Sequence, residues 1–133
     1  MSVAPKGRDL DSQTKAAVAA RAALDKQAEG VLMIDLRALS NVTDFFVVCT
    51  AGSERQISAI KEHIEAALAS RGATVWHAEG ITPPAPGGSP RDPQWMLMDC
   101  GDVVIHVLDQ RGREFYRIED LWGDAPRVPL PPA

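Results

Sequence analysis

The sequence has few cysteines and no long apolar run. Only two of its 133 residues are cysteine, Cys49 and Cys100, which gives no zinc-ligand spacing and argues against a disulfide framework. We expect two buried or half-buried, unpaired thiols in a reducing compartment. No apolar run approaches the roughly 20 residues that a membrane-spanning helix needs, and residues 1–13 have no apolar core of signal-peptide length. The sequence therefore predicts a cytoplasmic protein with no membrane contact.

Positive charge is also scarce. The chain has 14 Lys and Arg against 18 Asp and Glu, a formal net charge of −4 and a pI of about 5.3. Proteins that hold nucleic acid through its phosphates need clustered Lys and Arg, so we expect little direct nucleic-acid contact. An acidic surface suits a basic protein partner better.

The length suits one domain, and the residue patterns give a mixed order of elements. In the first half we expect a helix at residues 11–29, a strand at 31–39, a strand at 45–50 and a helix at 57–72. In the second half we expect a strand at residues 73–78 and a Pro/Gly-rich loop at 81–94. A two-stranded hairpin around Cys100-Gly101 is expected at 95–109, and a helix at 113–122. This order predicts an α/β fold, in which helices pack against a mixed sheet.

The predicted domain covers residues 10–123. Residues 1–9 are expected to be a flexible N-terminus. Residues 124–133 are rich in proline and are expected to be a disordered tail.

The stretch Thr50-Ala51-Gly52-Ser53 follows an apolar strand and leads into a helix, as phosphate-binding loops do. It lacks the lysine of a P-loop and the glycines of a dinucleotide site. The alternating carboxylates with which nucleotidyltransferases hold Mg²⁺ are also missing after it. Nucleophilic catalysis by Ser53 or Cys49 would need a base; the candidates are His63, His77 and His106. The simpler interpretation is that Ser53 caps the helix. The enzymatic alternative is a degenerate nucleotidyltransferase that binds a nucleotide through this turn.

Several side chains leave two interpretations open. His106 lies in an apolar strand, where an imidazole needs a hydrogen-bond partner; it is either a structural histidine or a ring that donates across an interface. Trp95 and Tyr116 belong either to the core or to an interface, because Trp and Tyr often anchor interfaces. Phe115 and Trp122 share the apolar face of the last predicted helix, which favours the core.

Short motifs occur in a fixed order along the chain. SNVTDFFVVCTAGSERQ at residues 40–56 is followed by a Glu-Gly pair, a tryptophan, an Asp-x-Gly-Asp turn, a histidine in an apolar strand, Arg-x-x-Tyr and a closing Leu-Trp. The residues that carry the later motifs are Glu79, Gly80, Trp95, Asp99, Gly101, Asp102, His106, Arg113, Tyr116, Leu121 and Trp122. Over about residues 10–123 the chain resembles the ribosomal silencing factor family, also called Iojap-like. The long link before Trp95 and the proline-rich tail depart from that family's pattern.

The resemblance implies a protein that is not an enzyme and needs no metal or cofactor. Members bind the large ribosomal subunit through large-subunit ribosomal protein fourteen and sterically block its joining with the small subunit. This represses translation when nutrients are scarce, and a role in large-subunit biogenesis is also implied. The implied fold is a mixed sheet of nucleotidyltransferase-like topology without the catalytic carboxylates.

We expect the partner to be bound by the hairpin and the segment after it. The expected partner-binding residues are Trp95, Asp99, Asp102, His106, Arg113, Tyr116, Glu119, Leu121 and Trp122. Carboxylates in this set would meet Lys and Arg of the partner, and Arg113 would pair with one of them. A homodimer of the free protein is also possible, because edge strands and exposed aromatic side chains support symmetric association.

Overall fold

Six strands form one sheet in the computed structural model, which describes residues 10–81 and 94–131. The strands are β1 Glu29–Asp35, β2 Phe45–Ala51, β3 His77–Ile81, β4 Trp95–Asp99, β5 Val103–Asp109 and β6 Arg127–Val128. Their order across the sheet is β3-β4-β5-β2-β1-β6. β2 and β5 are parallel and the other neighbours are antiparallel. The predicted mixed α/β sheet is confirmed.

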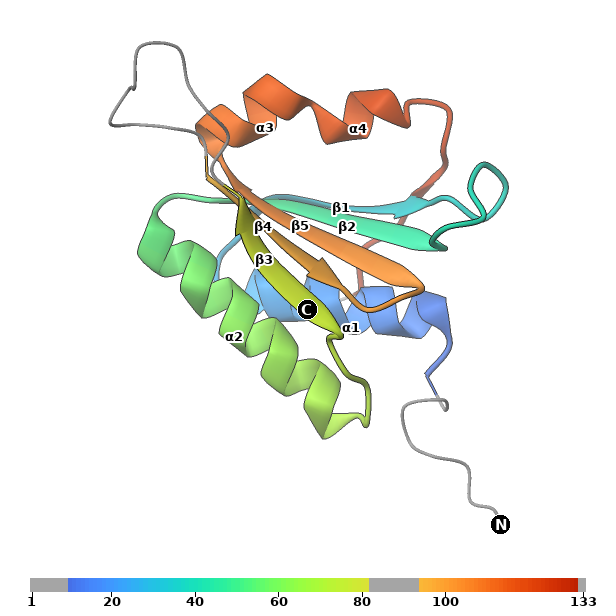
Figure 1. The fold of residues 1–133 in the computed structure, drawn as a ribbon, viewed down its shortest axis with the longest axis horizontal. Helices are drawn as coiled ribbons and strands as arrows, with labels where there is room; N and C mark the ends of the chain where they lie inside the picture. Colours follow the sequence, from blue (N-terminus) through green and yellow to red (C-terminus); the bar gives the residue numbers. More distant parts are fainter. Residues whose placement is uncertain (1–9, 82–93, 132–133) are drawn as a thin grey trace.

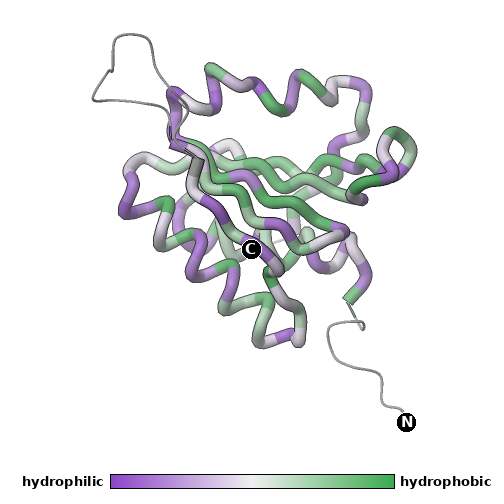
Figure 2. The backbone as a smooth tube through the Cα atoms, in the orientation of Figure 1, coloured by the Kyte–Doolittle hydropathy of each residue, from purple (hydrophilic) through white to green (hydrophobic). Residues whose placement is uncertain are grey.

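Helices lie on both faces of this sheet (Figure 1). α1 Ser12–Asp25 and α2 Glu54–Ser70 cover one face, and α3 Gln110–Tyr116 and α4 Ile118–Leu121 lie over the other. The helical spacing in the second predicted helix is confirmed, because its buried residues are Ile57, Ile60, Ile64 and Leu68. Figure 2 shows apolar central strands beside helices that alternate apolar and polar positions. Two apolar cores result, one on each face of the sheet.

Several elements have different bounds from those predicted. β1 spans Glu29–Asp35 rather than residues 31–39, and α2 begins at Glu54 rather than residue 57. α1 ends at Asp25 rather than near residue 29, because the chain reverses at Gln27 and Gly30, which both have positive φ. The alanines of this helix form the buried face, so alanine served packing as well as helix propensity. The third strand begins at His77 rather than Ala73, because its ladder with β4 starts where His77 lies opposite Asp99.

The end of the chain differs more. The helix predicted over residues 113–122 is broken at Arg117, which has left-handed backbone geometry (φ 49°) and separates α3 from α4. Phe115 is consequently 66% exposed, so its prediction as a core residue is wrong. The expectation of a disordered tail is wrong for residues 124–131: Ala125 is buried and β6 adds a short antiparallel strand to β1.

The predicted hairpin is confirmed, with β4 and β5 antiparallel. Their connection is residues 100–102, one residue longer than predicted, and Gly101 has φ +88° there. Residues 1–9 and 82–93, which carry the predicted flexible N-terminus and nearly all of the Pro/Gly-rich loop, lie outside the described residues. None of the helices in the described ranges has the length and apolarity to cross a bilayer.

Candidate protein-binding surface

A cluster of aromatic rings lies between the sheet and the α3–α4 segment. Strand register places Trp95 opposite Leu108 and therefore diagonal to His106 on the same sheet face. Trp95 Nε1 donates to His106 Nδ1 at 3.1 Å, and the Trp95 ring lies 4.8 Å from the ring of Tyr116. Phe46 of β2 lies 4.5 Å from the imidazole. Trp95 and Tyr116 are both half-buried, so this pair belongs partly to the core and partly to the surface.

His106 is buried beneath Trp95 and is not part of the protein surface. Only 4% of it is exposed, and burial lowers its pKa from 6.5 to about 4. The imidazole is therefore neutral near pH 7. Because Nδ1 accepts from Trp95, the ring proton resides on Nε2. Nε2 is buried and has no hydrogen-bond partner among the described residues. His106 is thus a structural histidine: its Nδ1 accepts the hydrogen bond that holds the half-buried Trp95 ring in place.

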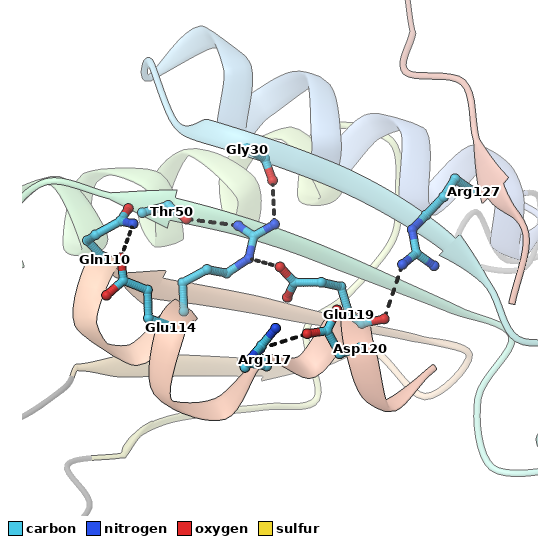
Figure 3. A network of polar contacts seen from close by, with 9 residues as sticks. Gly30, Thr50, Gln110, Glu114, Arg117, Glu119, Asp120 and Arg127 are labelled. Carbon is cyan, nitrogen blue, oxygen red and sulfur yellow. Dashed lines mark hydrogen bonds and ion pairs between the residues drawn. The ribbon is translucent and has the colours of Figure 1, made fainter. Parts of the chain in front are cut away.

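Arg113 fastens α3 and α4 to the sheet. Its guanidinium donates to Glu119 (2.9 Å), to Thr50 Oγ1 (2.8 Å) and to the Gly30 carbonyl (2.9 Å). Figure 3 labels these three partners and marks the hydrogen bonds with dashed lines. The predicted pairing of Arg113 with a carboxylate is confirmed. Both side chains of the ion pair are mostly buried, so breaking it leaves a poorly solvated charge. Arg113 and Glu119 therefore hold the surface in place, and little of either is available to a partner.

The side chains of α4 and the turn after it are more accessible. Leu121 is 75% exposed, and Trp122 is half-buried with its ring 6.1 Å from Phe46. Arg127 of β6 donates to the main-chain carbonyls of Glu119 and Trp122, which ties this turn to the sheet. Three of the predicted partner-binding residues pack in one core on the α3–α4 side: Trp95, Tyr116 and Trp122. Leu121 is next to Trp122 and is exposed.

The remaining predicted residues, Asp99 and Asp102, lie at the opposite end of the hairpin. The Asp99 carboxylate accepts from Gly101 N–H at 2.8 Å and shapes the turn. Asp102 forms an ion pair of 2.7 Å with Lys15 of α1. Trp76, which is 73% exposed, lies against Gly101. The structure therefore divides the predicted site into an aromatic group near α3–α4 and an acidic group at the hairpin turn.

Polar groups of the turn at residues 50–53 form hydrogen bonds within the chain. Ser53 Oγ accepts from Gln56 N–H at 3.1 Å, so the predicted helix cap is confirmed. The Gln56 side chain accepts from Gly52 N–H and donates to the carbonyls of Lys26 and Gln27. Burial raises the pKa of the Cys49 thiol to about 12, which makes it a poor nucleophile.

No metal-binding group of three His, Cys, Asp or Glu side chains occurs within residues 10–81 and 94–131. His63 lies against Asp25 and His77 against Glu79, each at the surface. The three histidines thus have different neighbours, and none of them forms a hydrogen bond with Ser53 among the described residues.

Comparison with known proteins decides the family. The family model described as "Ribosomal silencing factor during starvation" matches residues 9–133. The chain belongs to the ribosomal silencing factor family. The match includes the proline-rich tail, so the view that this tail departs from the family's pattern is wrong. Membership supports a ribosome-silencing role, which is regulatory rather than enzymatic, and an association with the ribosome.

The similar proteins agree. Ribosomal silencing factor RsfS of Halalkalibacterium halodurans is 34% identical over 91% of this chain and 96% of its own length. The protein of the same name from Bacillus subtilis is 37% identical over 85% of this chain and 88% of its own. A crystal structure of a Chromobacterium violaceum protein has a TM-score of 0.73 and 27% identity, and covers 93% of this chain and 95% of that one.

Besides Phe115, sequence reasoning missed the exposure of Leu39, Val42 and Trp76. Leu39 lies at the end of the strand predicted over residues 31–39, and Val42 lies between that strand and the next, where an apolar side chain gives no sign of its exposure. Trp76 was placed inside a predicted strand. Only the three-dimensional arrangement shows that no described element covers these side chains.

Proposed function

We propose that this protein binds the large ribosomal subunit in the cytoplasm through ribosomal protein fourteen and sterically blocks joining of the small subunit. Translation would then fall when nutrients are limited. The mechanism requires only that the bound domain occupy the surface where the small subunit docks. Its efficacy depends on the lifetime of the complex, and no reacting group is needed.

The half-buried pair Trp95–Tyr116 supports this proposal most directly. Large aromatic side chains that are held rigidly and remain partly exposed are typical centres of protein interfaces. Here Trp95 is held by His106, and Tyr116 is held on α3 by the Arg113–Glu119 clamp. The net charge of −4 favours association with a basic ribosomal protein and disfavours direct contact with RNA.

Sedimentation with purified large subunits tests the proposal. We expect the protein to co-sediment with large subunits and to reduce the joined particle when small subunits are added. Tyr116→Ala and Trp95→Ala should lose binding while remaining folded. Trp76→Ala, which also removes an aromatic side chain but at the other end of the hairpin, serves as the control. Absence of the wild-type protein from the large-subunit fraction at low salt would refute the proposal.

A further inference from the structure

A pocket next to the aromatic cluster is lined by exposed apolar side chains. Leu39, in the connection between β1 and β2, and Leu121 of α4 are 49% and 75% exposed. They face a pocket of about 380 Å³ whose walls are Leu39, Asp120, Leu121, Trp122, Gly123 and Asp124. Segments about 80 residues apart in the sequence thus form one concave surface.

The pocket is formed by hydrogen-bonded segments. Leu36 is fully buried, its N–H donates to the Asp44 carbonyl, and its carbonyl accepts from the N–H groups of Leu39 and Ser40. The Ser40 hydroxyl accepts from Val42 N–H at 3.1 Å. On the other wall, the Trp122 ring packs against the sheet through Phe46. The main chain therefore holds Leu39 outward in a fixed place, although its side chain is apolar.

The charges around the pocket define its occupant. Asp120 and Asp124 are the charged residues in its walls, and both are exposed. Asp120 forms an ion pair with Arg117, while Asp124 leaves a negative charge on the rim. This arrangement fits an apolar side chain that is flanked by Lys or Arg, and it repels phosphate groups.

We propose that this pocket receives an apolar side chain from a basic segment of the ribosomal-protein partner. The inference rests on the proposed function and names a second contact beside Trp95 and Tyr116. The two surfaces are continuous through Trp122, which lines the pocket and packs in the same core as both aromatic residues. The pocket extends the partner surface onto the β1–β2 connection.

The test measures binding of the intact protein to purified large subunits. Leu39→Ser and Leu121→Ser should each weaken binding roughly tenfold or more, because each removes apolar contact from the pocket. Leu130→Ser is the matched control, since Leu130 is 39% exposed in the tail and lies outside the pocket walls; it should bind as the wild type does. Thermal unfolding confirms that each variant is folded.

Charge reversal identifies the occupant. Asp124→Lys should weaken binding if the occupant is a basic protein segment, whereas stronger binding would mean RNA and would overturn the inference. Unchanged binding of Leu39→Ser and Leu121→Ser, with wild-type protein bound, would overturn the pocket and leave the proposed function standing. Failure of the wild type to bind would overturn both. A wild-type dimer that Leu121→Ser dissociates, without loss of subunit binding, would assign the pocket to a second copy instead.

Discussion

His106 should make the stability of this protein depend on pH. The residue is 4% exposed, and its imidazole donates no hydrogen bond to a described residue through Nε2 and accepts the Trp95 indole N–H at Nδ1. A second proton on the ring would remove that acceptor and place a charge among apolar side chains. Burial accordingly lowers the pKa from 6.5 to about 4 in the folded protein.

The sign and magnitude follow from proton linkage. Above pH 6.5 the imidazole is neutral in both the folded and the unfolded chain, and its titration changes nothing. Between pH 6.5 and about 4 the unfolded chain binds a proton that the folded chain does not, so the free energy of unfolding falls as pH is lowered. The pKa difference corresponds to a loss of about 3 kcal/mol across this interval.

The assay is urea denaturation at pH 7, 5.5 and 4, followed by tryptophan fluorescence. His106→Asn is the reference, because its side-chain oxygen takes a position close to Nδ1 and can accept from Trp95, and because it does not titrate. Asp11 and Asp35, whose pKa values are lowered by hydrogen bonds with Thr14 and Arg37, are present in both proteins and cancel. We expect the wild type to lose about 3 kcal/mol relative to the variant between pH 7 and pH 4.

Equal pH dependence in the two proteins would refute the reasoning. It would mean that the folded protein protonates His106 as readily as the unfolded chain does, and hence that the ring is solvated. An NMR titration of the His106 ring provides an independent check, with an expected pKa of about 4. A value near 6.5 would show that the Trp95–His106 pair opens in solution.

Two further substitutions test the supports of the surface. Arg113→Ala should lower the free energy of unfolding by about 3 kcal/mol, because it leaves the Glu119 carboxylate mostly buried without its cation. In a Glu119→Gln background the same substitution should cost less. An equal cost in the two backgrounds would show that Arg113 and Glu119 are not coupled. Gly101→Ala should cost about 1–2 kcal/mol, because φ is +88° there. A new Cβ would also meet the Trp76 ring at 2.7 Å. If the loss of stability disappears in a Trp76→Ala background, it comes from this steric clash and not from the backbone angle. Urea denaturation measures the stability of the Arg113 and the Gly101 variants.

The elements that the sequence predicted well are those specified by local patterns. The hairpin has two β-rich runs on either side of Gly101, and α2 has an apolar residue at every turn from Ile57 to Leu68. The Ser53 cap is equally local, since its acceptor and the donor of Gln56 are three residues apart. In each case the residues that decide the structure lie next to one another in the chain.

The errors occurred where distant contacts decide the structure. The α3–α4 break places Arg117 in a left-handed conformation, and Arg113 of α3 then reaches Glu119 of α4, Thr50 and Gly30. Helical periodicity continues through this break and gives no sign of it. β6 was missed for a similar reason: a two-residue strand in a proline-rich segment is specified by its ladder with β1, more than 90 residues earlier.

The sequence also predicted more of the site's membership than of its geometry. Tyr116 is the last residue of α3 and Leu121 the last of α4, so both lie on the α3–α4 side, while Asp102 lies at the far end of the hairpin, paired with Lys15. A list of motif residues cannot show this division, because strand length separates the two ends of β5. Nor could it show that His106 is buried behind Trp95, since a histidine in an apolar strand can belong either to the core or to an interface.

The two faces of the sheet differ in how fully helices cover them, and this difference explains why a partner would bind. α1 and α2 have 14 and 17 residues, whereas α3 and α4 have only seven and four. Two short helices cannot cover a six-stranded sheet, so Leu97 and Val104, on the same face as Trp95, remain half-buried. A partner that packed there would complete the missing layer and remove this apolar surface from water. Steric occlusion needs such a surface and no reactive group.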